Sequence, residues 1–203
     1  MSLPLVSPPG ERSGGARVAG VLLAAGTSSR FGDENKLLAP VDGAPMVRRS
    51  AETLLDAGLR EVVVVVGYEA DRVRDALAGL DVRFAENPDY ESGQASSVRT
   101  GVNALADADA AVFALGDMPY VDAESVTALA ATHEATGRSA LAAGFEGERG
   151  NPVLFDATHF DALASTDGDT GGKAVLLSAP DAAVVETGDP GVRRDVDRPD
   201  EFA

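Results

Sequence analysis

Residues 21–32 read VLLAAGTSSRFG and decide the fold, and Lys36 follows four residues later. An apolar run breaks here into a loop of small residues with two glycines, and it then presents Arg30 and Lys36 six residues apart. Glycine lets backbone amides approach a ligand closely, and the two cations supply charge for an anion. The chain has only one other lysine, Lys173. The stretch therefore predicts a phosphate-binding loop; the alternative is an ordinary connection with solvated charges.

The composition limits the kind of protein. A chain of 203 residues with 44% hydrophobic content can bury one sizeable core. The net charge of −16 argues against a broad nucleic-acid surface, because neutralising phosphates requires a basic patch. The absence of cysteine excludes disulfides, thiolate metal sites and cysteine nucleophiles. Many Ala, Val, Asp and Glu with few lysines indicate a halophilic, salt-adapted organism.

Residues 1–17 contain Pro8-Pro9-Gly10 and Gly14-Gly15. They lack the basic start and apolar centre of a signal peptide, and no apolar run in the chain approaches the roughly 18 residues that span a bilayer. We therefore expect a disordered N-terminal tail over 1–17, one folded domain over 18–203, a cytoplasmic protein and no membrane partner.

From residue 18 onwards, strand-like and helix-like segments alternate. Short β-branched runs bounded by Gly or Asp predict buried strands, and amphipathic stretches that begin near Pro, Asp or Ser predict helices. This alternation predicts an α/β protein with a single-domain, Rossmann-like, mostly parallel sheet and helices on both faces. Residues 137–172 are interpreted as an insertion that covers the site. The predicted strands are 18–24, 61–66, 82–85, 110–115, 139–143, 152–155 and 182–186.

Three loops of this pattern follow predicted parallel strands. Residues 26–36 follow the first strand, Asn87-Pro88 the third and Asp117 the fourth. Ligands of such sheets bind outside the carboxyl ends of the strands. We therefore expect the three loops to meet at one edge of the sheet.

Asp117 ends an apolar strand inside Gly-Asp-Met-Pro, which suits a ligand of a divalent cation better than a turn aspartate. In a strand, the two carboxylates of Asp195-Val196-Asp197 would point to the same face, so one of them could complete that metal site. The alternative is that both are surface carboxylates of an acidic protein. Ser96 and Ser97 are either helix caps or groups that read a base.

Other phosphate-binding motifs fit less well. The loop at 21–32 lacks the full Gly-x-Gly-x-x-Gly spacing of dinucleotide-binding folds, which disfavours a nicotinamide dehydrogenase. Residues 167–174 resemble a P-loop, but Asp167 replaces its first glycine and Ala174 its magnesium-binding hydroxyl residue. A P-loop ATPase is therefore disfavoured.

Taken together, the motifs resemble a known family. They are Leu23-Ala24-Ala25-Gly26-x-Ser28-x-Arg30-x-Gly32-x-x-x-Lys36, Asn87-Pro88, Gly93-Gln94-Ala95-Ser96-Ser97-Val98 with Gly101, Gly116-Asp117-Met118-Pro119, Gly150-Asn151-Pro152-Val153-Leu154-Phe155, Gly168-Asp169-Thr170-Gly171-Gly172 and Asp195-Val196-Asp197. In this order they resemble the molybdenum cofactor cytidylyltransferases, which are nucleotidyltransferases of the nucleotide-diphospho-sugar transferase fold. The resemblance implies transfer of CMP from CTP to the phosphate of molybdopterin, with release of pyrophosphate.

The resemblance also implies roles for individual residues. Arg30, Lys36 and Asp117 would be catalytic, with Mg²⁺ as cofactor held by Asp117 and Asp197. The implied nucleotide-binding residues are Leu23, Ala24, Ala25, Gly26, Arg30, Lys36, Gly93, Ser96 and Ser97. The implied acceptor-binding residues are Asn151, Gly171, Gly172 and Lys173, and a molybdenum hydroxylase would be the recipient of the product.

Three alternatives stay open. Ala24-Ala25-Gly26 favours CTP, since guanylyl-transferring relatives carry a Gly-Gly pair, but a guanylyltransferase of the same fold remains an alternative. Lys173 stands where many relatives have arginine, so a point charge replaces a bidentate fork and a sugar or polyol phosphate becomes a possible acceptor. A non-catalytic molybdoenzyme accessory protein is the third alternative.

Overall fold

Eight strands form the central sheet of the computed structural model, which describes residues 3–27, 35–168 and 171–196. Their order is β1-β10-β8-β9-β7-β2-β5-β6, and within the described part of the chain only β9 runs antiparallel to its neighbours. The strands are β1 Leu5–Val6, β2 Val18–Ala24, β5 Val62–Val66, β6 Arg83–Glu86, β7 Ala110–Leu115, β8 Ala140–Phe145, β9 Glu148–Asp156 and β10 Ala183–Glu186. A small hairpin pairs β3 Pro40–Val41 with β4 Ala44–Pro45. The expected mostly parallel α/β sheet is confirmed.

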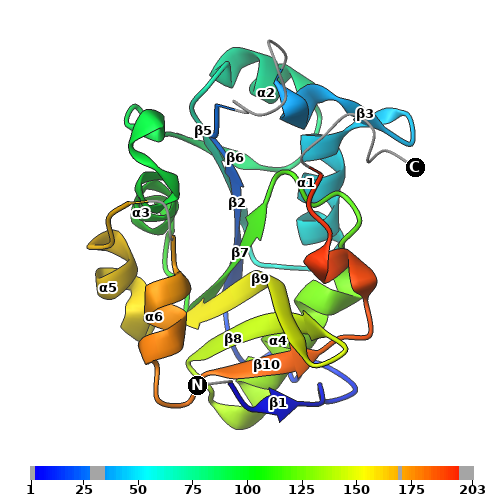
Figure 1. The fold of residues 1–203 in the computed structure, drawn as a ribbon, viewed down its shortest axis with the longest axis vertical. Helices are drawn as coiled ribbons and strands as arrows, with labels where there is room; N and C mark the ends of the chain where they lie inside the picture. The colour runs from blue at the N-terminus through cyan, green and yellow to red at the C-terminus, as the bar shows by residue number, and fades with distance from the viewer. Residues whose placement is uncertain (1–2, 28–34, 169–170, 197–203) are drawn as a thin grey trace.

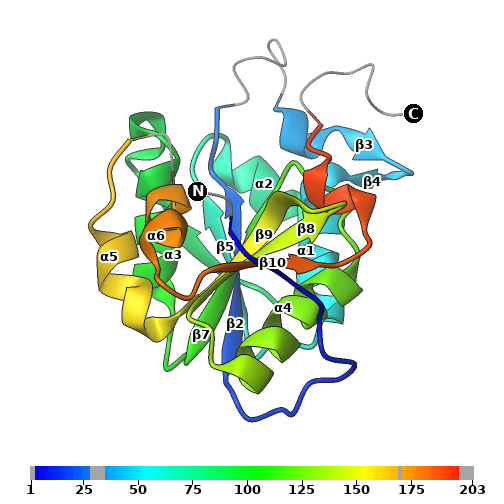
Figure 2. The ribbon, with the colours of Figure 1, turned by 60° about the horizontal axis from the view of Figure 1, so that its bottom comes forward.

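Helices cover both faces of this sheet. Figures 1 and 2 show α3, α5 and α6 on one side and α1 and α4 on the other. The helices are α1 Met46–Asp56, α2 Ala70–Ala76, α3 Gln94–Ala104, α4 Ala123–Thr136, α5 Phe160–Ala164 and α6 Lys173–Ser178. No helix among the described residues has both the length and the apolar character needed to cross a bilayer.

The pleat of the central strands sorts the core into two layers. Along β2, Leu22 packs with the apolar faces of α1, α2 and α4, whereas Val21 packs with α3, α5 and α6. All five valines of β5 are buried, because helices cover that strand on both sides. Each fully buried Val or Leu contributes about 1.5–3 kcal/mol, so the core holds the central strands firmly.

One glycine sets how closely α3 approaches the sheet. A Cβ atom at Gly101 would lie 2.5 Å from Val21 Cγ1, so a larger residue there would push the helix off β2. This close packing places the start of α3 beside the carboxyl ends of β2 and β5.

The expected disordered tail is wrong for residues 3–17. Leu5 and Val6 of β1 pair in parallel with Val184 and Val185 of β10 and extend the sheet at its edge. Further along, Arg12 and the amide of Gly14 bind the carboxylate of Glu134. An open sheet edge and a buried carboxylate order a segment whose Pro and Gly content suggests disorder.

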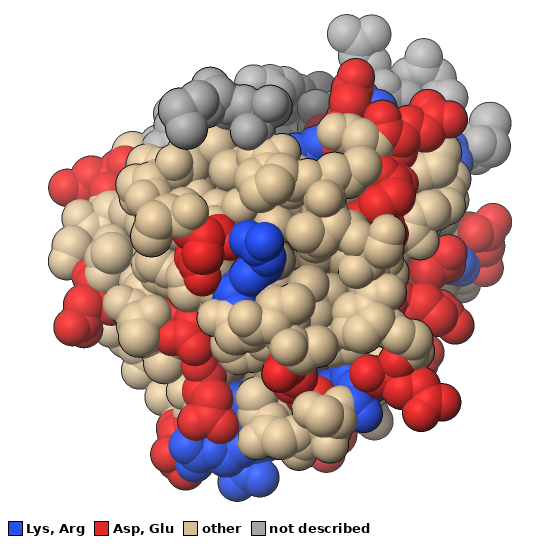
Figure 3. All heavy atoms as spheres, turned by 90° about the horizontal axis from the view of Figure 1, so that it is seen from below, with Lys and Arg blue, Asp and Glu red and all other residues tan. Residues whose placement is uncertain are grey.

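On the face drawn in Figure 3, basic and acidic side chains lie next to one another.

The expected insertion over 137–172 is also wrong. Residues 140–145 and 148–156 form β8 and β9 of the central sheet, and β8 lies between β10 and β9. The hairpin between them reverses the chain, and this reversal makes β9 antiparallel to β7. The two strands predicted in this region, 139–143 and 152–155, are present, but sequence alternation marks a strand and not its partner, so it does not show that they belong to the central sheet.

Candidate active site

Three strands end together at one edge of the sheet. The amide of Gly116, after β7, donates to the carbonyl of Leu23 in β2 over 3.0 Å. The amide of Tyr68, after β5, donates to the carbonyl of Ala25 over 3.1 Å. Ala24 and Ala25 are buried and Gly26 is exposed, so the chain leaves the core at the glycine. The amide of Asn87, after β6, donates to the carbonyl of Val66 at the end of β5 over 2.8 Å. The described parts of the three predicted loops therefore lie along the carboxyl edge of the sheet.

Lys36 and Asp117 meet at this edge. Lys36 Nζ donates to Asp117 Oδ2 over 2.7 Å, and the two side chains are only 16% and 21% exposed. Asn35 positions the lysine, because its Oδ1 accepts from the amide of Leu37 and starts the 3₁₀ turn Lys36–Leu38. The structure thus joins the two predicted residues that are 81 positions apart. Arg30 lies outside the described residues.

One carboxylate oxygen of Asp117 has no partner among the described residues. Its Oδ1 is buried and accepts no hydrogen bond from the described residues. An ionised carboxylate oxygen that is buried and unpaired is costly, and a divalent cation would compensate it. The donor chemistry at Asp117 therefore fits a metal ion.

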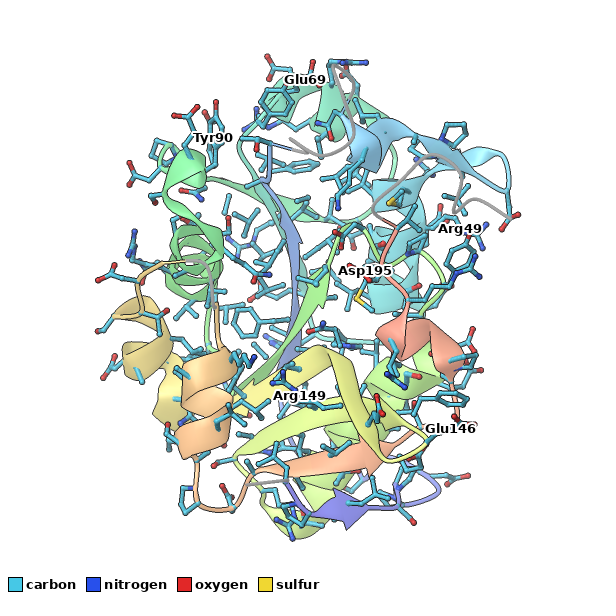
Figure 4. The ribbon with its side chains drawn as sticks, viewed as in Figure 1. Arg49, Glu69, Tyr90, Glu146, Arg149 and Asp195 are labelled. Atoms are coloured by element: carbon cyan, nitrogen blue, oxygen red, sulfur yellow. The ribbon has the colours of Figure 1, made fainter. Side chains whose placement is uncertain are left out.

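The C-terminal segment runs beside this aspartate. The amide of Val196 donates to the carbonyl of Asp117 over 3.0 Å, and the Val196 side chain is fully buried. Asp195 is exposed, and Figure 4 shows it on the chain segment that passes α1. Asp197, the predicted second ligand, lies outside the described residues. Within residues 3–27, 35–168 and 171–196, no group of three acidic or histidine side chains forms a metal cluster.

The two predicted base-reading serines are buried in a hydrogen-bond network. Asn87 Nδ2 donates to Ser96 Oγ over 2.8 Å and to Ser97 Oγ over 3.1 Å. Ser96 Oγ also donates to the carbonyl of Gly93, which begins α3 with a φ of +102°. The serine hydroxyls therefore brace the loop after β6 against α3, and their contact with a base stays a prediction.

A pocket of about 360 Å³ opens beside these loops. Leu23 and Leu115 form its wall at the carboxyl ends of β2 and β7, and Asn151, Gly172 and Lys173 line it from β9 and the start of α6. Three of the four predicted acceptor-binding residues thus lie on one pocket.

The glycines at 171 and 172 let the chain pass close to the pocket wall. A Cβ atom at Gly172 would lie 2.9 Å from Phe155 Cε2. Gly171 has a φ of +50°, and a Cβ atom there would lie 3.0 Å from Gln94 Oε1. Gly172 therefore lines the pocket with its backbone, whereas Gly171 contacts the pocket residue Gln94.

Arg149 is a pocket residue that sequence reasoning missed. It directly precedes the Gly150-Asn151-Pro152 motif, and an arginine beside such a motif in an acidic chain was the available signal. Figure 4 shows it on β9, on the side toward α6.

A parallel sheet with a lysine–aspartate pair and a cationic pocket at its carboxyl edge has the features of a phosphate-transferring enzyme. Residues 20–183 match the MobA-like NTP transferase domain, and the chain belongs to this family. It is accordingly a nucleotidyltransferase.

Two curated relatives illustrate the range of the family. The chain is 37% identical over 171 residues to nicotine blue oxidoreductase of Paenarthrobacter nicotinovorans, which covers 80% of this chain and 83% of that protein. It is also 37% identical over 115 residues to a probable molybdenum cofactor guanylyltransferase of Natronomonas pharaonis, covering 57% of this chain and 54% of the relative. Family membership therefore leaves the substrate open.

Solved structures agree with the fold. A nucleotidyl transferase from Methanothermobacter superposes with a TM-score of 0.79 at 25% identity, covering 92% of this chain and 94% of that one. The manganese complex of Rv0371c from Mycobacterium tuberculosis gives a TM-score of 0.75 at 26% identity, covering 92% and 96% of the two chains.

Proposed function

We propose that this enzyme transfers CMP from CTP to the phosphate of a molybdopterin-type acceptor and releases pyrophosphate. One observation carries the proposal: the Lys36–Asp117 pair lies at the carboxyl edge of the sheet, next to a pocket lined by cations. The Lys36–Asp117 pair suits a triphosphate with its metal, and the cationic pocket suits a phosphate acceptor. A molybdenum hydroxylase is the proposed recipient of the product.

Lys36 is the proposed partner of the triphosphate. In the structure it neutralises Asp117, and an incoming polyphosphate would compete for its ammonium group. Arg30 would add a second cation from the same loop. The amides at Ala25 and Gly26 are proposed to contact the phosphates, because they follow β2 at the sheet edge.

Asp117 is the proposed metal ligand, with Mg²⁺ as the ion and Asp197 as the second ligand. The first assignment is supported by Asp117 Oδ1, which has no hydrogen-bond partner within the described part of the chain. A bound Mg²⁺ would polarise the phosphoryl oxygens and offset the charge that develops on pyrophosphate.

In the proposed reaction, a phosphate oxygen of the acceptor attacks the α-phosphorus of CTP. The bond from that phosphorus to the oxygen shared with the β-phosphate breaks, and pyrophosphate leaves with the electron pair. No side chain needs to form a covalent intermediate, so positioning and charge carry the catalysis.

The preference for CTP is proposed from Ala24-Ala25-Gly26. The methyl group of Ala25 is buried against the loop after β5, where a Cβ atom added at Gly67 would lie 3.0 Å from Ala25 Cβ. The proposal rests on the resemblance, because guanylyl-transferring relatives carry a Gly-Gly pair where this chain has Ala25-Gly26.

The test measures pyrophosphate release with each of four NTPs, Mg²⁺ and molybdopterin. We expect turnover with CTP, and Asp117→Asn provides the inactive control. Turnover with GTP alone would identify a guanylyltransferase, as the similarity to the Natronomonas protein suggests. Turnover only with a sugar or polyol phosphate would overturn the acceptor. No release with any pair would leave a cofactor-binding accessory role.

A second candidate comes from the similarity to nicotine blue oxidoreductase, which extends over four-fifths of the chain. A redox activity would appear as consumption of NADH or NADPH in the presence of a quinonoid dye. We expect no such consumption, because Lys36 and Asp117 suit a metal-bound triphosphate and the dinucleotide glycine fingerprint is incomplete.

A further inference from the structure

The pocket beside the active site departs from the charge balance of the chain. The protein has 33 acidic and 17 basic residues, yet none of the 13 described residues that line the pocket is Asp or Glu. Two of them, Arg149 and Lys173, are cationic. In a strongly acidic protein, a cavity with cations and no carboxylate favours an anionic ligand.

Arg149 is available to such a ligand. The side chains of most other described arginines contact a carboxylate or a backbone carbonyl, whereas the Arg149 guanidinium has no hydrogen bond or ion pair with any described residue. The carboxylate next to it in sequence, Glu148, is engaged in an ion pair with Arg193.

The backbone that carries Arg149 is tightly placed. A Cβ atom at Gly150 would lie 2.0 Å from the carbonyl oxygen of Val192, so β9 packs backbone to backbone against the 3₁₀ turn Pro190–Arg193. This contact determines where β9 presents Arg149 along the pocket wall. A guanidinium group on a fixed strand can form the paired hydrogen bonds that a phosphate accepts.

The other wall of the pocket is apolar. Phe113 and Phe155 meet edge to face, with their ring centroids 6.0 Å apart, and Leu23 and Leu176 lie beside them. The pocket therefore combines an apolar, partly aromatic wall with a cationic wall. Such a pocket suits a ligand with a flat ring system and one anionic group.

We propose that Arg149 binds the phosphate of the acceptor as a bidentate anchor, and that the acceptor class is a phosphate monoester with a flat ring system. Lys173 contributes the second positive charge from the start of α6. This inference rests on the proposed function, since it assigns the pocket to the acceptor.

The test uses full-length protein and isothermal titration with 4-nitrophenyl phosphate as the probe. Mg²⁺ and a non-hydrolysable CTP analogue saturate the nucleotide site. We expect Arg149→Gln to weaken probe binding about tenfold or more, and Arg149→Lys to weaken it less, because a lost charge-assisted hydrogen bond is worth about 1.5–3 kcal/mol. Binding of 4-nitrophenol should be weak and equal in all variants.

Arg60→Gln is the matched control. Arg60 is exposed and has no side-chain partner among the described residues, and its amide bonds Val18 at the opposite end of β2. It removes the same charge far from the pocket and should leave probe binding unchanged.

The outcomes separate this inference from the proposed function. Unchanged probe affinity in Arg149→Gln would overturn the assignment of Arg149. An equal loss of affinity for Mg²⁺–CTP would also overturn it, because the arginine would then serve the nucleotide. If the wild type does not turn over molybdopterin but Arg149→Gln still loses the probe, the proposed acceptor fails and the anchor stands. With turnover, Arg149→Gln should raise KM for the acceptor and leave KM for CTP unchanged.

Discussion

Polar side chains at the two ends of the sheet differ in whether they have protein partners. At the amino ends of the strands, Asp109 binds Arg17, Glu134 binds Arg12, and Asp181 accepts from the amide and hydroxyl of Ser139. At the carboxyl ends, one oxygen of Asp117 has no partner among the described residues, and Arg149 and Lys173 face a pocket.

This difference separates structural from functional polar groups. A buried polar group that is paired stabilises the fold, whereas an unpaired one costs free energy until a ligand completes it. The amino end is thus expected to respond to mutation through stability, and the carboxyl end through activity.

The largest effect is expected for Asp117→Asn. Losing a charged group that stabilises the transition state typically lowers kcat by about 10²–10³. The free energy of unfolding should change by only about 1 kcal/mol, since the pair with Lys36 is partly exposed. Pyrophosphate release measures kcat, and urea unfolding measures the free energy of unfolding. A variant that unfolds readily but keeps its turnover would contradict the division.

A smaller effect on rate is expected for Lys36→Met, at about 10²-fold. The same change should tighten binding of Mn²⁺ to the nucleotide-free protein, because no ammonium group would then compete for Asp117. Electron paramagnetic resonance measures the free Mn²⁺, and Asp117→Asn shows the affinity that remains without the carboxylate. Weaker Mn²⁺ binding in Lys36→Met would mean that the lysine supports the metal site.

At the other end, Glu134→Gln should lower the free energy of unfolding by about 1–3 kcal/mol, because it removes charge-assisted hydrogen bonds from Arg12, Ser13 and Gly14. Turnover should be unchanged. Glu11→Gln is the control, because Glu11 is an exposed carboxylate in the same segment. A loss of activity without a loss of stability would break the comparison.

The smallest effect concerns pH. Burial raises the pKa of Glu134, but its hydrogen bonds lower it more, so the net pKa lies below the ordinary 4.5. The pKa of Asp181 is lowered below 3.8 in the same way, by Ser139 against the effect of burial. Groups with depressed pKa values stabilise the folded state above the ordinary pKa, and this contribution is lost as the pH falls through the lowered one.

The melting temperature should therefore fall as the pH drops below about 4.5, the ordinary glutamate pKa. Asp122 acts in the opposite sense, because burial and the neighbouring Asp189 raise its pKa. The melting temperature of Glu134→Gln should fall less steeply with decreasing pH than that of the wild type. An equally steep fall in the two proteins would show that Glu134 does not contribute to acid unfolding.

Much of the site was predictable because its residues follow strands. The apolar runs that end at Ala24 and Leu115 are local patterns, and parallel strands place their carboxyl ends at one edge. Lys36 and Asp117 could therefore be paired without knowing the strand order. The pocket could not be predicted in this way. Arg149 lies on β9, and the antiparallel course of β9 depends on its pairing with β7 and β8.

The sequence by itself determined the class of fold, the loop after the first strand and the placement of Asp117, since each depends on neighbours in the chain. Only the tertiary structure decided that β1 joins the edge of the sheet, that Ser96 and Ser97 brace Asn87, and that Arg149 lines the pocket. Those outcomes depend on which distant segments pair and pack, and a local pattern of residues does not encode the partner.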